Sequence, residues 1–218
     1  MKATRLILCF SALLIGGSSA IADTVPVTLT GFSGPTAFGY YVGAYYGTIN
    51  GDPVTLYCVD FPNDVYAGEQ WQANLTPIDG SNDLSNTRYG GAVDLPDALT
   101  LYQEAAWLAT QYAANPSDTG DIQATIWQLF DPGAPSPSSD YWLLQAEANY
   151  ASLDFGIWEV VTNEGPVTAT GQVQEFLVDA PVPEPTSLVL FGTVAIVACA
   201  LLRRRIRTRL SEIGAPIK

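Results

Sequence analysis

The chain has 218 residues and a formal charge of −13, which is very unevenly distributed. Between residues 23 and 185 the sequence has 21 acidic side chains and a single basic one, Arg88, which gives this part a formal charge of −20. Such a segment has no basic patch that could neutralise phosphates, so binding of nucleic acids is excluded.

The N-terminus has the pattern of a secretory signal peptide. Lys2 and Arg5 precede an apolar run, which leads through small residues to an A-x-A pattern just before Asp23. The run is well short of a bilayer span, and the A-x-A pattern marks a cleavage site. We therefore assign residues 1–22 to a signal peptide and residues 23–180 to an exported domain.

The first part of the exported domain has the pattern of β-strands. Apolar residues alternate with small or polar ones after residue 24, residues 38–49 are dense in tyrosine and glycine, and residues 54–61 form a third run. Asn50 and Gly51 separate the last two runs, and both tolerate the positive φ of a type I′ turn. The sequence thus predicts a three-stranded antiparallel meander.

A polar stretch follows at residues 62–96, and it predicts loops with one short strand around residues 69–74. It carries Asp79, Asn82 and Asp83, whose oxygens suit calcium, but their spacing is not that of an EF-hand. We interpret them as part of a solvated acidic loop, and we expect neither a metal nor a cofactor.

Helical periodicity begins at Asp97 and ends at Asn115-Pro116. A second helix is predicted from Asp118 or Thr119 as N-cap to Phe130, and a third over residues 139–151.

Strand patterns return over residues 156–162 and 167–178. This order predicts an α+β fold, with a mostly antiparallel β-sheet and a helical insertion.

Chemistry that needs histidine is excluded, because the sequence contains none. Among so many carboxylates, no acid and nucleophile pair of a glycosidase stands out. We therefore predict that the protein is not an enzyme.

Of the three cysteines, Cys9 lies in the signal peptide and Cys199 in the C-terminal apolar run, so Cys58 is the only cysteine of the exported domain. A disulfide within the domain is therefore excluded, and an unpaired exported cysteine needs an explanation. The predicted second helix places Gln123 on the same face as Trp127, so an amide falls on an apolar side.

The strand sequence Tyr57-Cys58-Val59-Asp60 and the helix that carries Gln123 and Trp127 resemble the thioester domains of bacterial surface adhesins. The resemblance implies that the Cys58 sulfur and the Gln123 side chain form an internal thioester with loss of ammonia, surrounded by Tyr57, Asp60 and Trp127.

The helix departs from that pattern, since isoleucine precedes the glutamine where the adhesins often have threonine and the A-x-I-W part is shifted. The same residues also fit a buried inert thiol and a hydrogen-bonded core amide. A non-covalent structural or carbohydrate-interacting matrix protein is therefore the alternative function. The expected partners are an exopolysaccharide or an amine-bearing surface ligand.

The C-terminus carries Pro183-Glu184-Pro185, an apolar run over residues 186–202, and Arg203-Arg204-Arg205 within a basic cluster. An apolar run of this length spans a bilayer with arginine snorkelling, and the arginines predict a cytoplasmic C-terminus.

These features resemble the PEP-CTERM sorting signal. That resemblance implies processing by an exosortase-type enzyme in a bacterium that makes biofilm exopolysaccharide. We assign residues 181–209 to this signal and residues 210–218 to a short cytoplasmic tail. The chain is thus expected to be anchored transiently in the inner membrane, and the domain then to reach the cell surface or extracellular matrix for adhesion.

Overall fold

The computed structural model describes residues 24–92, 95, 97–165 and 173–179. The predicted signal peptide, sorting signal and cytoplasmic tail lie outside these residues.

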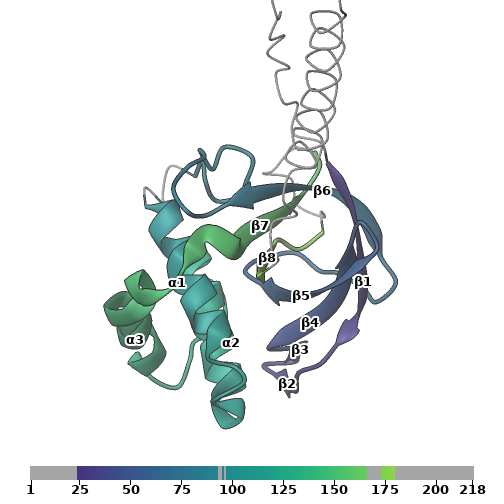
Figure 1. Cartoon of the computed structure of the whole chain (residues 1–218). Helices are drawn as coiled ribbons and strands as arrows, with labels where there is room; N and C mark the ends of the chain where they lie inside the picture. Colours follow the sequence, from purple (N-terminus) through teal and green to yellow (C-terminus); the bar gives the residue numbers. More distant parts are fainter. Residues whose placement is uncertain (1–23, 93–94, 96, 166–172, 180–218) are drawn as a thin grey trace, which may run out of the picture.

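Six antiparallel strands close into a β-barrel, in the order β1-β4-β5-β8-β7-β6, with β6 pairing back to β1 (Figure 1). Because the barrel is closed, each of these six strands has a hydrogen-bonded partner on both sides. The strands are β1 (Val25–Phe32), β4 (Ala44–Ile49), β5 (Asp52–Cys58), β6 (Gln70–Pro77), β7 (Trp158–Asn163) and β8 (Phe176–Asp179).

The predicted meander is confirmed, since β4 pairs with both β1 and β5. Asn50 and Gly51, which join β4 to β5, have φ values of 56° and 90°, as a type I′ turn requires. The tyrosine- and glycine-rich run is not one strand, however. A small hairpin of β2 (Thr36–Ala37) and β3 (Tyr40–Tyr41) precedes β4, because Gly39 and Gly43 have positive φ and break the extended path.

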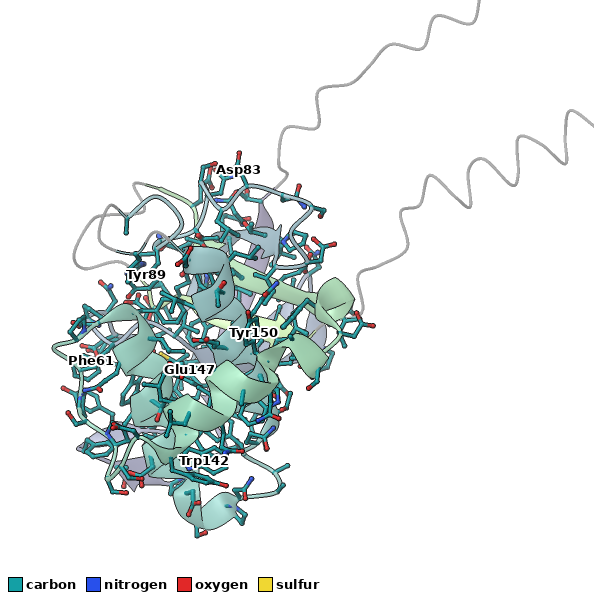
Figure 2. All side chains as sticks on the ribbon, turned by 90° about the vertical axis from the view of Figure 1, so that its left-hand side faces the viewer. Phe61, Asp83, Tyr89, Trp142, Glu147 and Tyr150 are labelled. Carbon is teal, nitrogen blue, oxygen red and sulfur yellow. The ribbon has the colours of Figure 1, made fainter. Side chains whose placement is uncertain are left out.

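Among the described residues between β6 and β7 there are three α-helices: α1 (Ala98–Thr110), α2 (Thr119–Phe130) and α3 (Tyr141–Asn149). They agree with the predicted helices to within a few residues. Short 3₁₀ turns flank them at η1 (Pro116–Asp118), η2 (Tyr150–Ser152) and η3 (Phe155–Ile157). Figure 2 views the molecule from the helical side, where Trp142, Glu147 and Tyr150 lie in front of the barrel.

The barrel wall separates two hydrophobic cores. One core fills the barrel and contains Leu56, Cys58 and Phe176, while the other packs between the wall and the helices and contains Val59 and Leu177. Because side chains alternate along a strand, β5 and β8 contribute to both cores. Trp127 belongs to the barrel core although it lies on α2, so this side chain joins the helical layer to the barrel interior.

The predicted α+β class, with a mostly antiparallel sheet and a helical insertion, is therefore confirmed. Closure of the sheet into a barrel was not predicted. The short strand predicted around residues 69–74 is β6, which is longer than predicted. Of the strand predicted over residues 167–178, the described residues contain β8 (Phe176–Asp179).

Candidate functional site

Cys58 is the last residue of β5, and its side chain is completely buried. The indole Nε1–H of Trp127 donates a hydrogen bond to the Cys58 sulfur over 3.4 Å. The thiol in turn donates to the backbone carbonyl of Asp60 over 3.5 Å. The sulfur is thus held in one position by two different elements, the helix α2 and the segment after β5.

Gln123 lies in the middle of α2 and is also completely buried. Its Nε2 donates to the backbone carbonyl of Cys58 over 2.8 Å. Its Oε1 accepts two hydrogen bonds, from the Gly43 backbone N–H at 3.2 Å and from the Tyr112 hydroxyl at 2.8 Å. The amide is therefore fixed against the cysteine, and two donors point at its carbonyl oxygen.

Gly43 reaches Gln123 because of its unusual backbone conformation. Its φ is 92°, a region that side-chain-bearing residues rarely adopt, and a Cβ there would lie 3.0 Å from the Thr119 methyl carbon. A glycine is therefore needed for this N–H to point at the amide.

Tyr112 follows α1, and its ring stacks on that of Tyr57 with centroids 6.1 Å apart and an interplanar angle of 15°. Burial raises the pKa of the Tyr112 hydroxyl well above its usual range, and it raises the pKa of Tyr57 to about 12. At neutral pH the Tyr112 hydroxyl therefore carries its proton and acts as a donor to Gln123.

Burial also raises the pKa of the Cys58 thiol to about 12, and the hydrogen bond from Trp127 opposes this only in part. Cys58 is consequently a thiol at neutral pH. To act as a nucleophile it has to lose its proton as the new bond forms.

The Asp60 carboxylate finds its hydrogen-bond partners away from the Gln123 amide. It lies in a second buried group of polar residues, which we call the ionic cluster: Asp60, Arg88, Tyr89, Tyr102 and Glu175. Arg88, the single basic residue of the exported domain, forms an ion pair with Asp60 at 2.5 Å. Burial raises the pKa of Asp60, and the Arg88 charge and the Tyr89 hydroxyl oppose the rise.

Glu175 occupies the other side of the ionic cluster and is completely buried. It accepts hydrogen bonds from the Tyr102 hydroxyl, the Thr162 hydroxyl at 2.6 Å and the Arg88 backbone N–H at 2.7 Å. Burial nevertheless raises its pKa to about 7. The Glu175 backbone N–H also donates to Asp60, so the cluster connects β8 to the segment that follows Cys58.

The structure thus brings together Cys58, Gln123 and Trp127. Tyr57 packs on Tyr112, which contacts Gln123, whereas the Asp60 side chain lies in the ionic cluster. We call Gly43, Cys58, Tyr112, Gln123 and Trp127 the Cys–Gln site. Sequence reasoning missed Gly43 and Tyr112. Tyr112 lies within the predicted first helix, where helical periodicity does not show that its hydroxyl reaches Gln123, and Gly43 carries no signal except its place in a glycine-rich run.

Asp79 and Asp83 accept hydrogen bonds from Ser81 and Ser85 in an exposed loop. Within the described ranges, no group of three or more acidic or cysteine residues is arranged to hold a metal ion. Nor does any helix in those ranges have the length and hydropathy needed to cross a membrane.

Residues 181–205 match the PEP-CTERM protein-sorting motif, which supports an exported protein that an exosortase processes. No curated protein and no solved structure matches the chain.

Proposed function

We propose that this exosortase-sorted protein attaches covalently to a partner at the cell surface or in the extracellular matrix, through an internal thioester between Cys58 and Gln123. The observation that carries the proposal is the set of hydrogen bonds around the Gln123 amide. They fix the Gln123 amide against the backbone carbonyl of Cys58, the only cysteine of the domain, and they direct two donors at the carbonyl oxygen of that amide.

The reaction follows from this arrangement. The Cys58 sulfur attacks the side-chain carbonyl carbon of Gln123, and negative charge develops on Oε1, where the Gly43 N–H and the Tyr112 hydroxyl stabilise it. A carbon–sulfur bond forms and the carbon–nitrogen bond breaks. The amide nitrogen leaves as ammonia and takes up the thiol proton.

The closed thioester would be a stored electrophile. A partner amine attacks the same carbonyl carbon, a carbon–nitrogen bond forms, the carbon–sulfur bond breaks, and Cys58 recovers a proton from the amine. Complete burial of both residues keeps bulk water from the thioester before a partner arrives. The exported domain has no lysine, so no side-chain amine of its own can open the bond.

Intact-mass measurement of the exported protein tests the proposal. The mass should fall below that of the unmodified sequence by one ammonia, and methylamine should raise it by one methylamine. Cys58→Ala and Gln123→Ala should each abolish both changes. Gln128→Ala is the matched control, because Gln128 is another glutamine of α2 that bonds Ala134 and Ser136 instead, and it should retain both changes.

An unmodified mass, with Cys58 freely alkylated once the protein is unfolded, would contradict the proposed thioester. The alternative would then be a non-covalent matrix protein that interacts with carbohydrate. One observation favours it independently: Tyr40, Tyr41 and Tyr66 expose between 43% and 70% of their surface around one pocket.

A further inference from the structure

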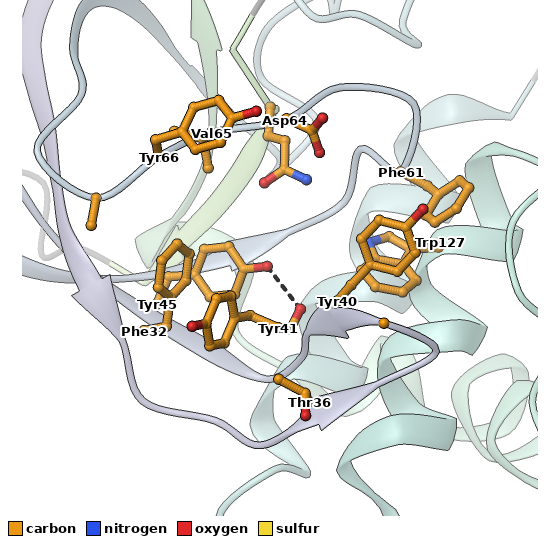
Figure 3. Close-up of a pocket in the computed structure, with 13 residues that line it drawn as sticks. Phe32, Thr36, Tyr40, Tyr41, Tyr45, Phe61, Asp64, Val65, Tyr66 and Trp127 are labelled. Carbon is orange, nitrogen blue, oxygen red and sulfur yellow. Dashed lines mark hydrogen bonds between the residues drawn. The ribbon is translucent and has the colours of Figure 1, made fainter.

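A pocket of about 480 Å³ lies between the β2–β3 hairpin, the segment after β5 and helix α2 (Figure 3). Seven of its thirteen lining residues are aromatic, and Trp127 forms part of its wall. The Trp127 indole also donates to the Cys58 sulfur, so the pocket adjoins the Cys–Gln site. Its volume is within the range typical of small-molecule sites.

The aromatic walls of the pocket are held in place by one another. Tyr41 stacks on Phe32 with centroids 4.2 Å apart and rings tilted by 4°. Tyr40 packs edge-on against both Phe61 and Trp127, and Figure 3 shows these three side chains together. A ligand would therefore meet ring faces that are already ordered, which lowers the entropic cost of binding.

The pocket lining carries a negative charge and no positive charge. Asp64 is its single acidic lining residue, and the lining contains no lysine or arginine. The only arginine of the exported domain is buried in the ion pair with Asp60. An anionic ligand would thus find no counter-charge, whereas a cation would be attracted both by Asp64 and by the negative faces of the aromatic rings.

We infer that this pocket binds an amino sugar, with the pyranose ring packed against the tyrosine faces and its ammonium group directed to Asp64. The ring supplies apolar C–H faces for the aromatic walls, and its hydroxyl groups suit the polar side chains of Thr36 and Gln174 at the lining. A slender alkylamine would leave most of the aromatic surface uncovered.

This inference names a partner class for the proposed function, and only its covalent step rests on the thioester. Binding itself can be measured in full-length Cys58→Ala protein, which cannot form the bond. In the unsubstituted protein a second amino group of the bound oligomer, in its uncharged form, would attack the Gln123 carbonyl once local opening exposes it, and the adduct would appear as a mass increase.

The test is calorimetric titration of full-length Cys58→Ala protein with three tetrasaccharides: a glucosamine oligomer, an N-acetylglucosamine oligomer and a glucose oligomer. The glucosamine oligomer should bind at least about tenfold more tightly than the other two. Repeating the titration in high salt separates the pocket from diffuse attraction to an acidic surface, since diffuse attraction is screened more strongly.

Matched variants place the binding in the pocket. Asp64→Asn should remove the preference for glucosamine, whereas Asp52→Asn, which removes an exposed charge outside the pocket, should leave it. Tyr66→Ala should weaken binding about fivefold. Tyr141→Ala is its control, because Tyr141 is an exposed tyrosine of α3 outside the pocket, and it should have no effect.

Equal affinity for the three oligosaccharides, or equal effects of Asp64→Asn and Asp52→Asn, would overturn the inference. An affinity for the glucosamine oligomer no higher than that for propylamine would also overturn it, because the pyranose ring would then contribute nothing to binding. Binding by Cys58→Ala without any sugar adduct in the unsubstituted protein would keep the amino-sugar site and remove only its covalent step, whereas an unmodified intact mass would contradict the thioester itself.

Discussion

The domain has two buried polar groups of residues, the ionic cluster and the Cys–Gln site, and both contact the short segment from Cys58 to Asp60. In the ionic cluster, charged groups meet partners of opposite charge or hydrogen-bond donors. In the Cys–Gln site no group is charged at neutral pH, and a thiol lies beside an amide that is polarised by two donors.

This difference shows that buried polar residues can serve either stability or chemistry. The ionic cluster connects β8 to the backbone that follows Cys58, and it offers no nucleophile to an electrophile. The Cys–Gln site contains both, and its amide is held by Gly43, Tyr112 and the Cys58 carbonyl, none of which belongs to the ionic cluster. Substitutions in the ionic cluster should therefore change the free energy of unfolding, whereas substitutions in the Cys–Gln site should change the chemistry.

The largest loss of stability is expected for Arg88→Met. It leaves the buried Asp60 carboxylate without its ion pair, and breaking a buried pair costs about 3 to 5 kcal/mol. Urea denaturation measures the loss, and Asp52→Asn is the control, because the exposed Asp52 should change the unfolding free energy by less than about 0.5 kcal/mol. The fraction that stays folded should still lack one ammonia. A folded Arg88→Met protein without that mass change would contradict the division of roles.

Opening the thioester should have an effect of similar size by another route. The bond would link two residues 65 positions apart, and a cross-link of that span restricts the unfolded chain by about 4 kcal/mol. Methylamine treatment should therefore lower the unfolding free energy of the unsubstituted protein by about this amount. Cys58→Ala protein, which has no bond to open, should be unaffected by the same treatment; an equal loss in both would show that methylamine acts elsewhere.

The ionic cluster should also make stability depend on pH. The folded pKa of Glu175 is about 7 against an ordinary value of 4.5, so the folded state holds the proton more tightly than the unfolded chain. Stability is then highest below pH 4.5 and falls by about 3 kcal/mol as the pH rises through 7.

Glu175→Gln should remove most of this slope in denaturation measured between pH 4.5 and 8. Asp60, Glu104, Glu159 and Asp179 also have raised pKa values, and they would leave a residual slope of the same sign. A slope unchanged by Glu175→Gln would show that its proton does not titrate in this range.

The sequence was sufficient to predict the strands around the Asn50-Gly51 turn and the three helices, because turn chemistry and helical periodicity are local. It also singled out Cys58 and Gln123, since both are unusual in their local surroundings. Barrel closure depends on pairing between β6 and β1 and between β5 and β8, which no local pattern specifies.

The rest of the Cys–Gln site could not be predicted from the sequence for the same reason. Gly43 and Tyr112 reach Gln123 from other elements, 80 and 11 positions away, and their roles depend on a backbone N–H and on a hydroxyl that points into the core. Arg88 was conspicuous as the lone basic residue, but nothing local indicated that Asp60 would be its partner.

The smallest free-energy effect is expected for Tyr112→Phe, and it acts on the rate of thioester formation. The variant keeps the ring that stacks on Tyr57 but removes one of the two donors to the Gln123 oxygen. Loss of one such donor slows comparable reactions about 100-fold or more. Protein purified unfolded, with its amide intact, can be refolded and followed by mass as ammonia is lost. Tyr141→Phe should cyclise at the unsubstituted rate. Cyclisation of Tyr112→Phe at that same rate, in a protein that unfolds at a similar urea concentration, would show that the tyrosine only packs beside the amide and does not stabilise the charge on its oxygen.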